Sequence, residues 1–520
     1  MSNIPAPGTL FLHLHPWLRW TTTPVLGNIL QMPLKHTHLH FAEWAKQYGG
    51  IYSLKISSDN LIILTSPRLV RDLLDKRNAT TADRPPMRLV DMVTSGLHVA
   101  FARHGPTWKS LRRTLQQLVT GEACARHLPL QRAEATQLMY DMLKEPEGFF
   151  NHIMRHTTSI IYSAVFGTRA PRFENSLASE FADMLHSWEK MLEPGAHAPI
   201  DLLPILQHVP ERWAPWKTQA REIRGKQQRM YYGLRDLCAK RISEDRRTGC
   251  FLEEVIENKK KFGLDDEMIA YVGGACLEGG ADTVAQYLRV FVLCMATHPH
   301  VQARAQKEID EVIGNTRAPS IEDIESLPYI RAIIQELHRF HPVTPLALPH
   351  ATTTDEVVDG YYIPAGSTVI MNAYGIYHDE NLYDRPEVFM PERFLDSEFG
   401  TKPGADTSGL RNDFPFGAGR RICIGTRFAQ NTIVPNVMNL LWAFNFEIKD
   451  GIIRDKVVPI RVDDFEPGVT SSARPFKCDI KPRSQAHIDI IRSEYAQARS
   501  LLRLYEQDLS PEERAFIENW

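Results

Sequence analysis

The sequence predicts a mainly α-helical fold with small β-sheets. Seven stretches have the apolar periodicity of long amphipathic or buried helices, at about 105–120, 130–145, 175–193, 217–245, 263–295, 299–313 and 326–339. Four short runs have the length and composition of strands, at 50–54, 61–64, 360–364 and 368–371. No Ser/Gly-rich linker, charge block or internal repeat divides the chain, which favours one large domain.

The helix at 105–120 places Trp108 and Arg112 four residues apart, so both side chains share one face and can reach one carboxylate. Taken alone, this is also the pattern of an ordinary surface helix, because basic side chains on helices are usually solvated. The helix at 326–339 places Glu336 and Arg339 at i and i+3, again on one face. Taken alone, that pair is a solvated ion pair that contributes little stability.

The helix at 263–295 begins with acidic residues, as helices usually do, and is mostly apolar. Its middle, Gly279-Gly280-Ala281-Asp282-Thr283, holds two glycines that each cost about 1 kcal/mol relative to alanine. Two interpretations are open: close packing of another helix on the glycines, or a local opening of the helix. Taken alone, the glycines favour close packing, because small residues inside helices usually serve that purpose, although the carboxylate of Asp282 and the hydroxyl of Thr283 stand beside them in an apolar setting.

The two later strands are separated by Ala365-Gly366-Ser367. A three-residue connection that contains glycine is typical of a hairpin, so we expect 360–364 to pair with 368–371.

The segment from Phe416 to Gly425 carries the most information about chemistry. Its glycines stand at positions 417, 419 and 425. Glycine permits positive φ angles and lets the main chain approach a flat ligand closely. The loop therefore predicts a surface on which a planar cofactor can lie.

Cys423 in this loop stands just before an apolar stretch, Thr426 to Phe444, that we expect to be a helix. The positive end of that helix dipole should lower the pKa of the thiol and favour a metal-binding thiolate. Arg421 offers a permanently charged fork suited to a carboxylate. A purely structural cysteine is a poor alternative, because this combination of residues arises by chance on the order of once in several hundred thousand positions.

The loop resembles the haem-thiolate signature of the cytochrome P450 family, matching it at Phe416, Gly417, Gly419, Arg421, Cys423 and Gly425. The resemblance implies the cytochrome P450 fold and a haem whose iron is bound axially by Cys423. The segment around Asp282 and Thr283 is similar to the oxygen-binding groove of that family, which favours the local opening. There, the matching acid and alcohol deliver protons and would be the catalytic residues.

The same resemblance extends to two further sets of residues. Glu336 and Arg339, with Arg393 of Pro391-Glu392-Arg393-Phe394, are similar to a buried structural triad of the family. The resemblance implies that the haem propionates are bound by Trp108, Arg112, His350 and Arg421, while Phe416 and Gly417 shape the cofactor loop. A histidine after a proline, such as His350, is otherwise an ordinary loop residue.

Composition excludes several other classes. The chain of 520 residues is 43% hydrophobic and 24% charged, as in ordinary globular proteins. Its net charge of −3 and scattered basic residues give no case for nucleic acid. The seven cysteines form no Cys-x-x-Cys pair, which argues against a zinc site or a disulfide framework and fits a reducing compartment.

We expect three segments along the chain. Residues 1–23 form an irregular N-terminal segment, in which His13 interrupts the apolar run and no transmembrane anchor is encoded. Residues 24–484 form the single cytochrome P450 domain. Residues 485–520 form a helical extension, in which an apolar stripe and the Ser510-Pro511-Glu512-Glu513 capping box predict two helices packed on the body.

The resemblance implies a mono-oxygenase that takes electrons from NADPH through NADPH-cytochrome P450 reductase and inserts one oxygen atom of O2 into a hydrophobic small molecule. The run 474–484 looks like that of filamentous-fungal members, which implies secondary-metabolite biosynthesis. Two alternatives remain: a haem-thiolate isomerase or dehydratase that uses no O2, and a non-catalytic haem-binding protein. The family also implies association with the endoplasmic reticulum, although the lack of an encoded anchor leaves a cytoplasmic location or peripheral membrane contact open.

Overall fold

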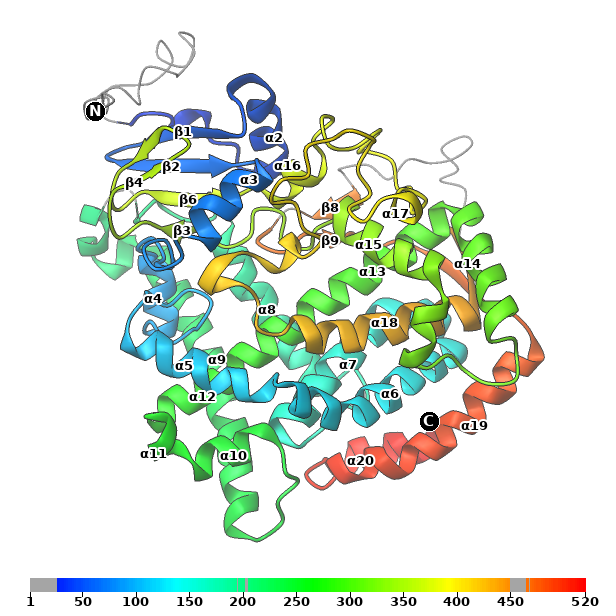
Figure 1. The fold of residues 1–520 in the computed structure, drawn as a ribbon. Coiled ribbons are helices and arrows are strands. Elements are labelled where there is room, and N and C mark those ends of the chain that lie inside the picture. The colour runs from blue at the N-terminus through cyan, green and yellow to red at the C-terminus, as the bar shows by residue number, and fades with distance from the viewer. Residues whose placement is uncertain (1–25, 194, 202–203, 449–463, 467) are drawn as a thin grey trace.

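The computed structural model describes residues 26–193, 195–201, 204–448, 464–466 and 468–520. The N-terminal segment predicted at 1–23 lies outside these residues. A sheet region occupies one corner of the molecule and helices form the rest (Figure 1). The fold is mainly α-helical with small sheets, as predicted.

The helices follow in chain order. They are α2 (Thr37–Tyr48), α3 (Pro67–Val70), α4 (Arg88–Thr94), α5 (Pro106–Leu118), α6 (Gly121–Lys144), α7 (Phe149–Ile161), α8 (Leu177–Leu192), α9 (Pro215–Ser243), α10 (Phe251–Glu257), α11 (Lys259–Phe262), α12 (Asp266–Leu277), α13 (Thr283–Thr297), α14 (Pro299–Val312), α15 (Pro328–Phe340), α16 (Ala373–Tyr377), α17 (Arg393–Asp396), α18 (Thr426–Ala443), α19 (Gln485–Leu502) and α20 (Pro511–Asn519).

Short 3-10 helices and π turns join them. The 3-10 helices are η2 (Ile29–Gln31), η4 (Pro146–Gly148), η6 (Pro204–His208), η7 (Glu211–Trp213), η9 (Ile321–Ser326), η10 (Phe414–Phe416), η11 (Gly419–Arg421) and η13 (Arg503–Tyr505). The π turns are η3 (Arg71–Asp75), η5 (Tyr162–Phe166) and η8 (Glu278–Asp282). All seven predicted helices are present, although α6 begins nine residues earlier than expected, at Gly121 rather than 130.

The strands are β1 (Ile51–Ile56), β2 (Asp59–Leu64), β3 (His350–Ala351), β4 (Glu356–Val358), β5 (Tyr361–Ile363), β6 (Thr368–Met371), β7 (Phe444–Ile448), β8 (Phe465–Glu466), β9 (Ser472–Ala473) and β10 (Cys478–Pro482). The largest sheet has the order β1-β2-β6-β3, with β2 and β6 parallel and Ile63 opposite Ile370. Strands β7 and β10 form a separate antiparallel pair.

The predicted hairpin between 360–364 and 368–371 is wrong. Strand β5 pairs with β4, and β6 pairs with β2 and β3 instead. The reason is the Asp359-Gly360 dipeptide between β4 and β5, where both residues have positive φ angles, +51° and +81°. A two-residue turn of this kind matches the twist of paired strands and defines the hairpin more strongly than the longer connection does.

The central helix runs as α12, the π turn η8 and α13, so the local opening predicted around Gly279-Gly280 is confirmed. The packing interpretation also applies, but only to one of the glycines. A Cβ at Gly280 would lie 2.6 Å from Cδ1 of Ile161, whereas a Cβ at Gly279 would meet no atom within 4 Å. The two neighbouring glycines therefore serve different purposes.

The last helices, α19 and α20, run along the lower edge of the molecule beside α6 (Figure 1). Tyr495 of α19 stacks on Tyr140 of α6 with ring centroids 4.0 Å apart. Ser510 caps α20 in the predicted capping box with Glu513. The predicted stripe and the predicted helices at this end of the chain are confirmed.

Buried ion pairs tie this end to the body. Arg169 pairs with Glu506 at 3.0 Å, and Arg241 pairs with Asp508 at 2.7 Å. Both guanidinium groups are fully buried, where an unpaired charge would cost several kcal/mol. On the inner side, Arg169 also pairs with the fully buried Glu134.

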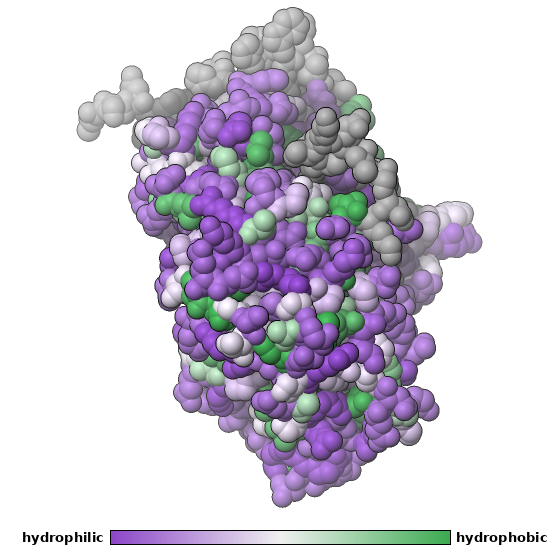
Figure 2. All heavy atoms as spheres, turned by 90° about the vertical axis from the view of Figure 1, so that its right-hand side faces the viewer, coloured by the Kyte–Doolittle hydropathy of each residue, from purple (hydrophilic) through white to green (hydrophobic). Residues whose placement is uncertain are grey.

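The surface at the right of Figure 1 is mostly hydrophilic, with hydrophobic residues scattered between polar ones (Figure 2). Within the described part of the chain, no helix combines the length and the apolar character needed to cross a membrane.

Candidate active site

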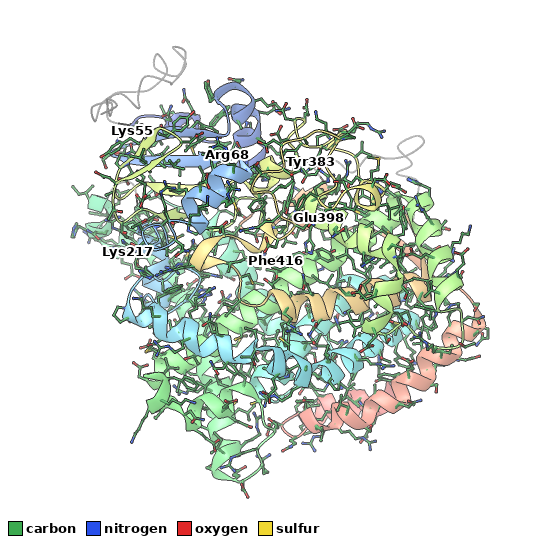
Figure 3. All side chains as sticks on the ribbon, in the orientation of Figure 1. Lys55, Arg68, Lys217, Tyr383, Glu398 and Phe416 are labelled. Carbon is green, nitrogen blue, oxygen red and sulfur yellow. The ribbon has the colours of Figure 1, made fainter. Side chains whose placement is uncertain are left out.

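The cysteine loop is built from two short 3-10 helices, η10 and η11, that lead into the N-terminus of α18. The backbone N–H of Cys423 donates to the carbonyl of Phe416 at 2.7 Å and closes the loop. Phe416 lies near the centre of the molecule in the view of Figure 3. Within the loop Ala418 and Arg421 are buried, while Arg420 and Cys423 are exposed.

Two of the three loop glycines have the backbone conformation predicted for them. Gly417 and Gly419 have φ angles of +91° and +59°, and a Cβ at Gly419 would lie 2.2 Å from the carbonyl oxygen of Leu74. No other residue fits at position 419 without displacing the backbone of η3. Gly425 differs, because its φ of −81° is open to any residue.

The thiol of Cys423 is reached by solvent although the protein surrounds it. The side chain is exposed, yet burial is the main influence that raises the pKa of its thiol. Exposure and a raised pKa are compatible, because solvent can reach the sulfur atom although protein atoms surround it on most sides. The N–H of Gly425, the charge of Arg112 and the hydroxyl of Thr426 oppose the rise. The predicted lowering of the thiol pKa was therefore wrong in net direction, because burial outweighs the helix terminus.

The central helix carries a half-exposed stripe. Ala275, Gly279 and Thr283 follow each other at intervals of four and are partly or fully exposed, while their neighbours Leu277, Glu278 and Asp282 are buried. Residues at this spacing lie on one face. The side chains of this stripe are small, and a Cβ at Gly279 would meet no atom within 4 Å. The stripe therefore leaves room for a ligand beside the central helix.

Asp282 and Thr283 are neighbours in the chain but do not bond to each other. The hydroxyl of Thr283 donates to the carbonyl of Gly279 at 2.9 Å. The carboxyl of Asp282 accepts from Gln286 at 2.7 Å and lies 3.3 Å from the hydroxyl of Thr470. Burial raises the pKa of Asp282.

Trp108, Arg112 and Arg421 come together beside Cys423. The guanidinium carbon of Arg421 lies 4.2 Å from the centre of the Trp108 ring, and that of Arg112 lies 5.7 Å from it. Arg112 donates to the carbonyl of Ile422 at 2.7 Å, and Arg421 donates to that of Ala102 at 2.8 Å. Cationic side chains from α5 and η11 are thus fixed next to the cysteine.

Arg84 belongs to the same cluster, and the sequence analysis did not identify it. Its guanidinium donates to the carbonyls of Ala100 and Leu348, both at 2.8 Å. Burial and the charges of Arg421 and Arg112 lower its pKa. Nδ1 of His350, predicted from the sequence, donates to the carbonyl of Thr81 at 2.9 Å, and burial and Arg84 lower the pKa of His350 to about 3.

The positive charges of this cluster are not neutralised by nearby carboxylates of the described residues. In the described ranges, no carboxylate forms an ion pair with Arg84, Arg112 or Arg421. The indole N–H of Trp108, whose side chain is 5% exposed, has no hydrogen-bond partner. Buried donors are normally satisfied, so this set of groups fits an anionic ligand with several oxygen atoms.

The predicted structural triad is present. Arg339 pairs with Glu336 at 2.7 Å and Arg393 pairs with it at 3.2 Å. Glu336 is fully buried, and it also accepts from the backbone N–H of Met390. Arg339 donates to the carbonyl of Tyr377, so the triad connects α15 to the loops that precede the cysteine.

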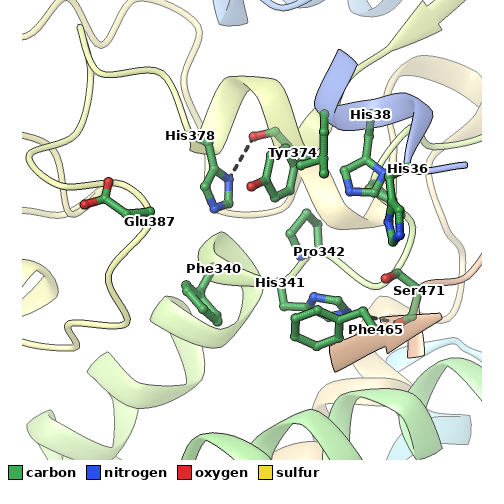
Figure 4. Close-up of a pocket in the computed structure, with 12 residues that line it drawn as sticks. His36, His38, Phe340, His341, Pro342, Tyr374, His378, Glu387, Phe465 and Ser471 are labelled. Carbon is green, nitrogen blue, oxygen red and sulfur yellow. Dashed lines mark hydrogen bonds between the residues drawn. The ribbon is translucent and has the colours of Figure 1, made fainter. Parts of the chain in front are cut away.

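A cavity of about 130 Å³ lies between α2, the end of α15, α16 and β8. Figure 4 shows its histidines, which come from three segments: His36, His38, His341 and His378. Within the described residues, no three metal-binding side chains are arranged to hold an ion. The cavity is therefore no metal centre.

The cation cluster and the indole N–H of Trp108 suit a ligand with carboxylates, and Cys423 beside them suits a ligand that accepts a single thiolate. Haem has these properties, and Trp108 with the cluster of arginines suits its propionates. The fold and the site thus define a haem-thiolate protein.

Comparisons with known proteins agree with this class. The model of the cytochrome P450 family matches residues 19–459. A cytochrome P450 monooxygenase of Armillaria gallica is 43% identical over 94% of this chain and 93% of its own length. The monooxygenase yanC of Aspergillus niger is 36% identical over 92% of this chain and 91% of its own length. The chain belongs to the cytochrome P450 family and is an oxidoreductase.

The fold comparison points the same way. A solved zebra fish cytochrome P450, determined with progesterone, superposes with a TM-score of 0.70 at 24% sequence identity. It covers 86% of this chain and 99% of that one. At this identity the likeness supports the shared fold.

Proposed function

We propose that this protein inserts one oxygen atom of dioxygen into a hydrophobic small molecule. The observation that carries the proposal is the set of cations without a carboxylate partner among the described residues and the unpartnered indole N–H beside a solvent-accessible cysteine. The bound haem would supply the activation of dioxygen and the oxidation of the substrate. Binding the haem, transferring protons and shaping the substrate cavity fall to side chains of this chain.

In this proposal Cys423 loses its proton and binds the iron, while Phe416 and Gly417 shape the loop around it. Trp108, Arg112, His350 and Arg421 bind the propionates, and we add Arg84 to them, because it shares their burial and their lack of a carboxylate. Asp282 and Thr283 would hold and transfer the protons that the reaction consumes. For this step the carboxyl of Asp282 has to turn from Gln286 and Thr470, its present partners.

The substrate cavity would be mostly apolar. Half-buried Leu97, Val99 and Phe101 lie between α4 and α5, and Phe101 contacts Trp188 of α8 edge to face. Apolar walls of this kind select hydrophobic molecules. The fungal origin of the similar monooxygenases supports a role in secondary metabolism, and the relatives' class supports electrons from NADPH through NADPH-cytochrome P450 reductase. No nucleic acid takes part.

We also propose peripheral contact with the endoplasmic-reticulum membrane. Four large apolar side chains on two adjacent segments are exposed by more than three fifths: Leu30, Leu34, Ile205 and Trp213. A Cβ at Gly195 would lie 3.1 Å from Leu34, so the segment before α2 touches the connection from α8 to α9, which carries the other two. Apolar side chains gathered in this way can enter the headgroup region of a bilayer. The three segments 1–23, 24–484 and 485–520 remain our proposal for the organisation of the chain.

The test is the absorption spectrum of the reduced protein with carbon monoxide. We expect the red-shifted band of a thiolate-bound haem, and we expect Cys423→Ala to abolish it. An unchanged band in that variant would refute the proposal. Thr283→Ala should retain haem and band, while a larger share of the NADPH consumed yields peroxide, because proton delivery is impaired.

A further inference from the structure

The hydroxyl of Thr470 lies between two carboxyl groups. It is 2.8 Å from Oε1 of Glu189 and 3.3 Å from Oδ2 of Asp282. The three residues come from α8, from the turn between β8 and β9, and from η8. Elements distant in the sequence thus converge on the acid that the proposed function uses for proton transfer.

The minimum number of protons in this group follows from its geometry. A threonine hydroxyl has one proton to donate, so it cannot donate to both carboxyls at once. If it donates to one, the other carboxyl has to be protonated and donate to the hydroxyl oxygen. The arrangement therefore contains at least one protonated carboxyl group.

The surroundings indicate which carboxyl is the acid. Gln286 donates to Asp282, and Arg289 donates to the amide oxygen of Gln286 at 3.3 Å, so the Asp282 side faces a cation. Glu189 faces the carboxyls of Asp282, Glu278 and Glu193. Burial and these charges raise the pKa of Glu189 to about 8, so its carboxyl holds the proton at neutral pH.

The position of Thr470 is fixed by its neighbours in the turn. The backbone N–H of Ser471 donates to the carbonyl of Val343 at 2.7 Å, and Nε2 of His341 lies 3.1 Å from the carbonyl oxygen of Ser471. Figure 4 shows His341 and Ser471 on the wall of the small cavity. The hydroxyl is thus held between α8 and the central helix by contacts on the far side of the turn.

We propose that Glu189 and Thr470 form the proton supply of Asp282. The carboxyl proton of Glu189 passes to the oxygen of Thr470 as the hydroxyl proton of Thr470 passes to the carboxylate of Asp282. Glu189 becomes the carboxylate, Asp282 becomes the acid, and water reprotonates the half-exposed Glu189. This inference rests on the proposed function, because it assigns the source of the proton that Asp282 would deliver.

The first experiment observes the proton directly. Infrared spectra of the purified haem-containing protein are recorded against pH in H2O and D2O. We expect the carbonyl band of a buried carboxylic acid that shifts in D2O, titrates near pH 8 and disappears in Glu189→Gln. The matched control Glu180→Gln, in the exposed first turn of α8, should retain it. A band that persists in Glu189→Gln would overturn the assignment.

The second experiment observes the transfer. NADPH-driven oxygen consumption with a reductase is measured at pH 7 without added substrate. Thr470→Val and Glu189→Gln should each slow it at least tenfold, whereas Thr470→Ser should restore it and Glu180→Gln should not change it. Equal rates in Thr470→Val and the unmodified protein would overturn the relay. Absence of the thiolate–haem band in the unmodified protein would instead refute the proposed function. Failure of the relay and failure of the proposed function are therefore distinguishable.

Discussion

Removing one N–H group from Trp108 tests the propionate cluster most sharply. Phe in place of Trp keeps an aromatic ring beside Arg421 but removes the indole donor that has no partner in the protein. A hydrogen bond to a charged group contributes about 1.5–3 kcal/mol. At about 1.4 kcal/mol for each factor of ten, Trp108→Phe should bind haem about 10- to 150-fold more weakly.

The same substitution should change the apoprotein little. Loss of an unpartnered buried donor releases a desolvation cost of about 1–3 kcal/mol, which offsets a similar loss of packing. Trp442 is the matched control, because its indole N–H donates to the carbonyl of Gly314 at 3.0 Å and its side chain is fully buried. Trp442→Phe should lower the free energy of unfolding by about 2–5 kcal/mol, with the affinity for haem little changed.

Two assays separate these effects. Transfer of haem from the holoprotein to excess apomyoglobin gives the rate of haem loss, and urea unfolding of the apoprotein gives its stability. We expect Trp108→Phe to lose haem faster and to unfold within about 1 kcal/mol of the unmodified protein. Wild-type haem retention in Trp108→Phe would refute the assignment of the cluster to the propionates.

Substitutions at four other positions should act as follows. Gly279→Ala should raise the free energy of unfolding by up to about 1 kcal/mol. Gly280→Ala should lower it by about 1–3 kcal/mol, because the added Cβ would lie too close to Ile161. Equal effects of the two substitutions in urea unfolding would contradict this. Glu336→Gln should cost about 3–5 kcal/mol in thermal unfolding, because two buried arginines lose their partner, and a loss below about 1 kcal/mol would contradict the triad's role. Although burial opposes it, arginines hold the pKa of Glu134 below its ordinary value of 4.5. The stability from this group is therefore present above that pH and is lost as the pH falls through the lowered pKa, so Glu134→Gln should show a flatter acid titration of stability.

The sequence alone predicted the parts of the fold that depend on local patterns. Long apolar periodicity located the main helices, and the resemblance to an oxygen-binding groove at Gly279-Gly280 predicted the local opening at η8. The hairpin failed because two local signals competed, and the shorter Asp359-Gly360 turn determined the pairing. Strand pairs such as β7 with β10 depend on contacts between distant segments and have no local signature.

The candidate site shows the same division. Cys423 stands in a distinctive loop, so its spacing identified it. Arg84 is one of 60 lysines and arginines, and it joins the cluster only because the fold brings it to Arg421, 337 residues later in the chain. Glu189 and Thr470 are likewise ordinary helix and turn residues in the sequence. Their significance depends on a hydrogen bond that spans 281 residues.

The ion pairs that anchor the last helices have a consequence for how the protein is made. Arg169 and Arg241 bond to Glu506 and Asp508, which follow them by 337 and 267 residues. At a translation rate of about 5–20 residues per second, the first of these arginines waits about 15–70 seconds for its carboxylate. During that interval Arg169 can pair with Glu134 but not with Glu506, because Glu506 has not yet been synthesised. We therefore expect the last step of assembly to follow release from the ribosome.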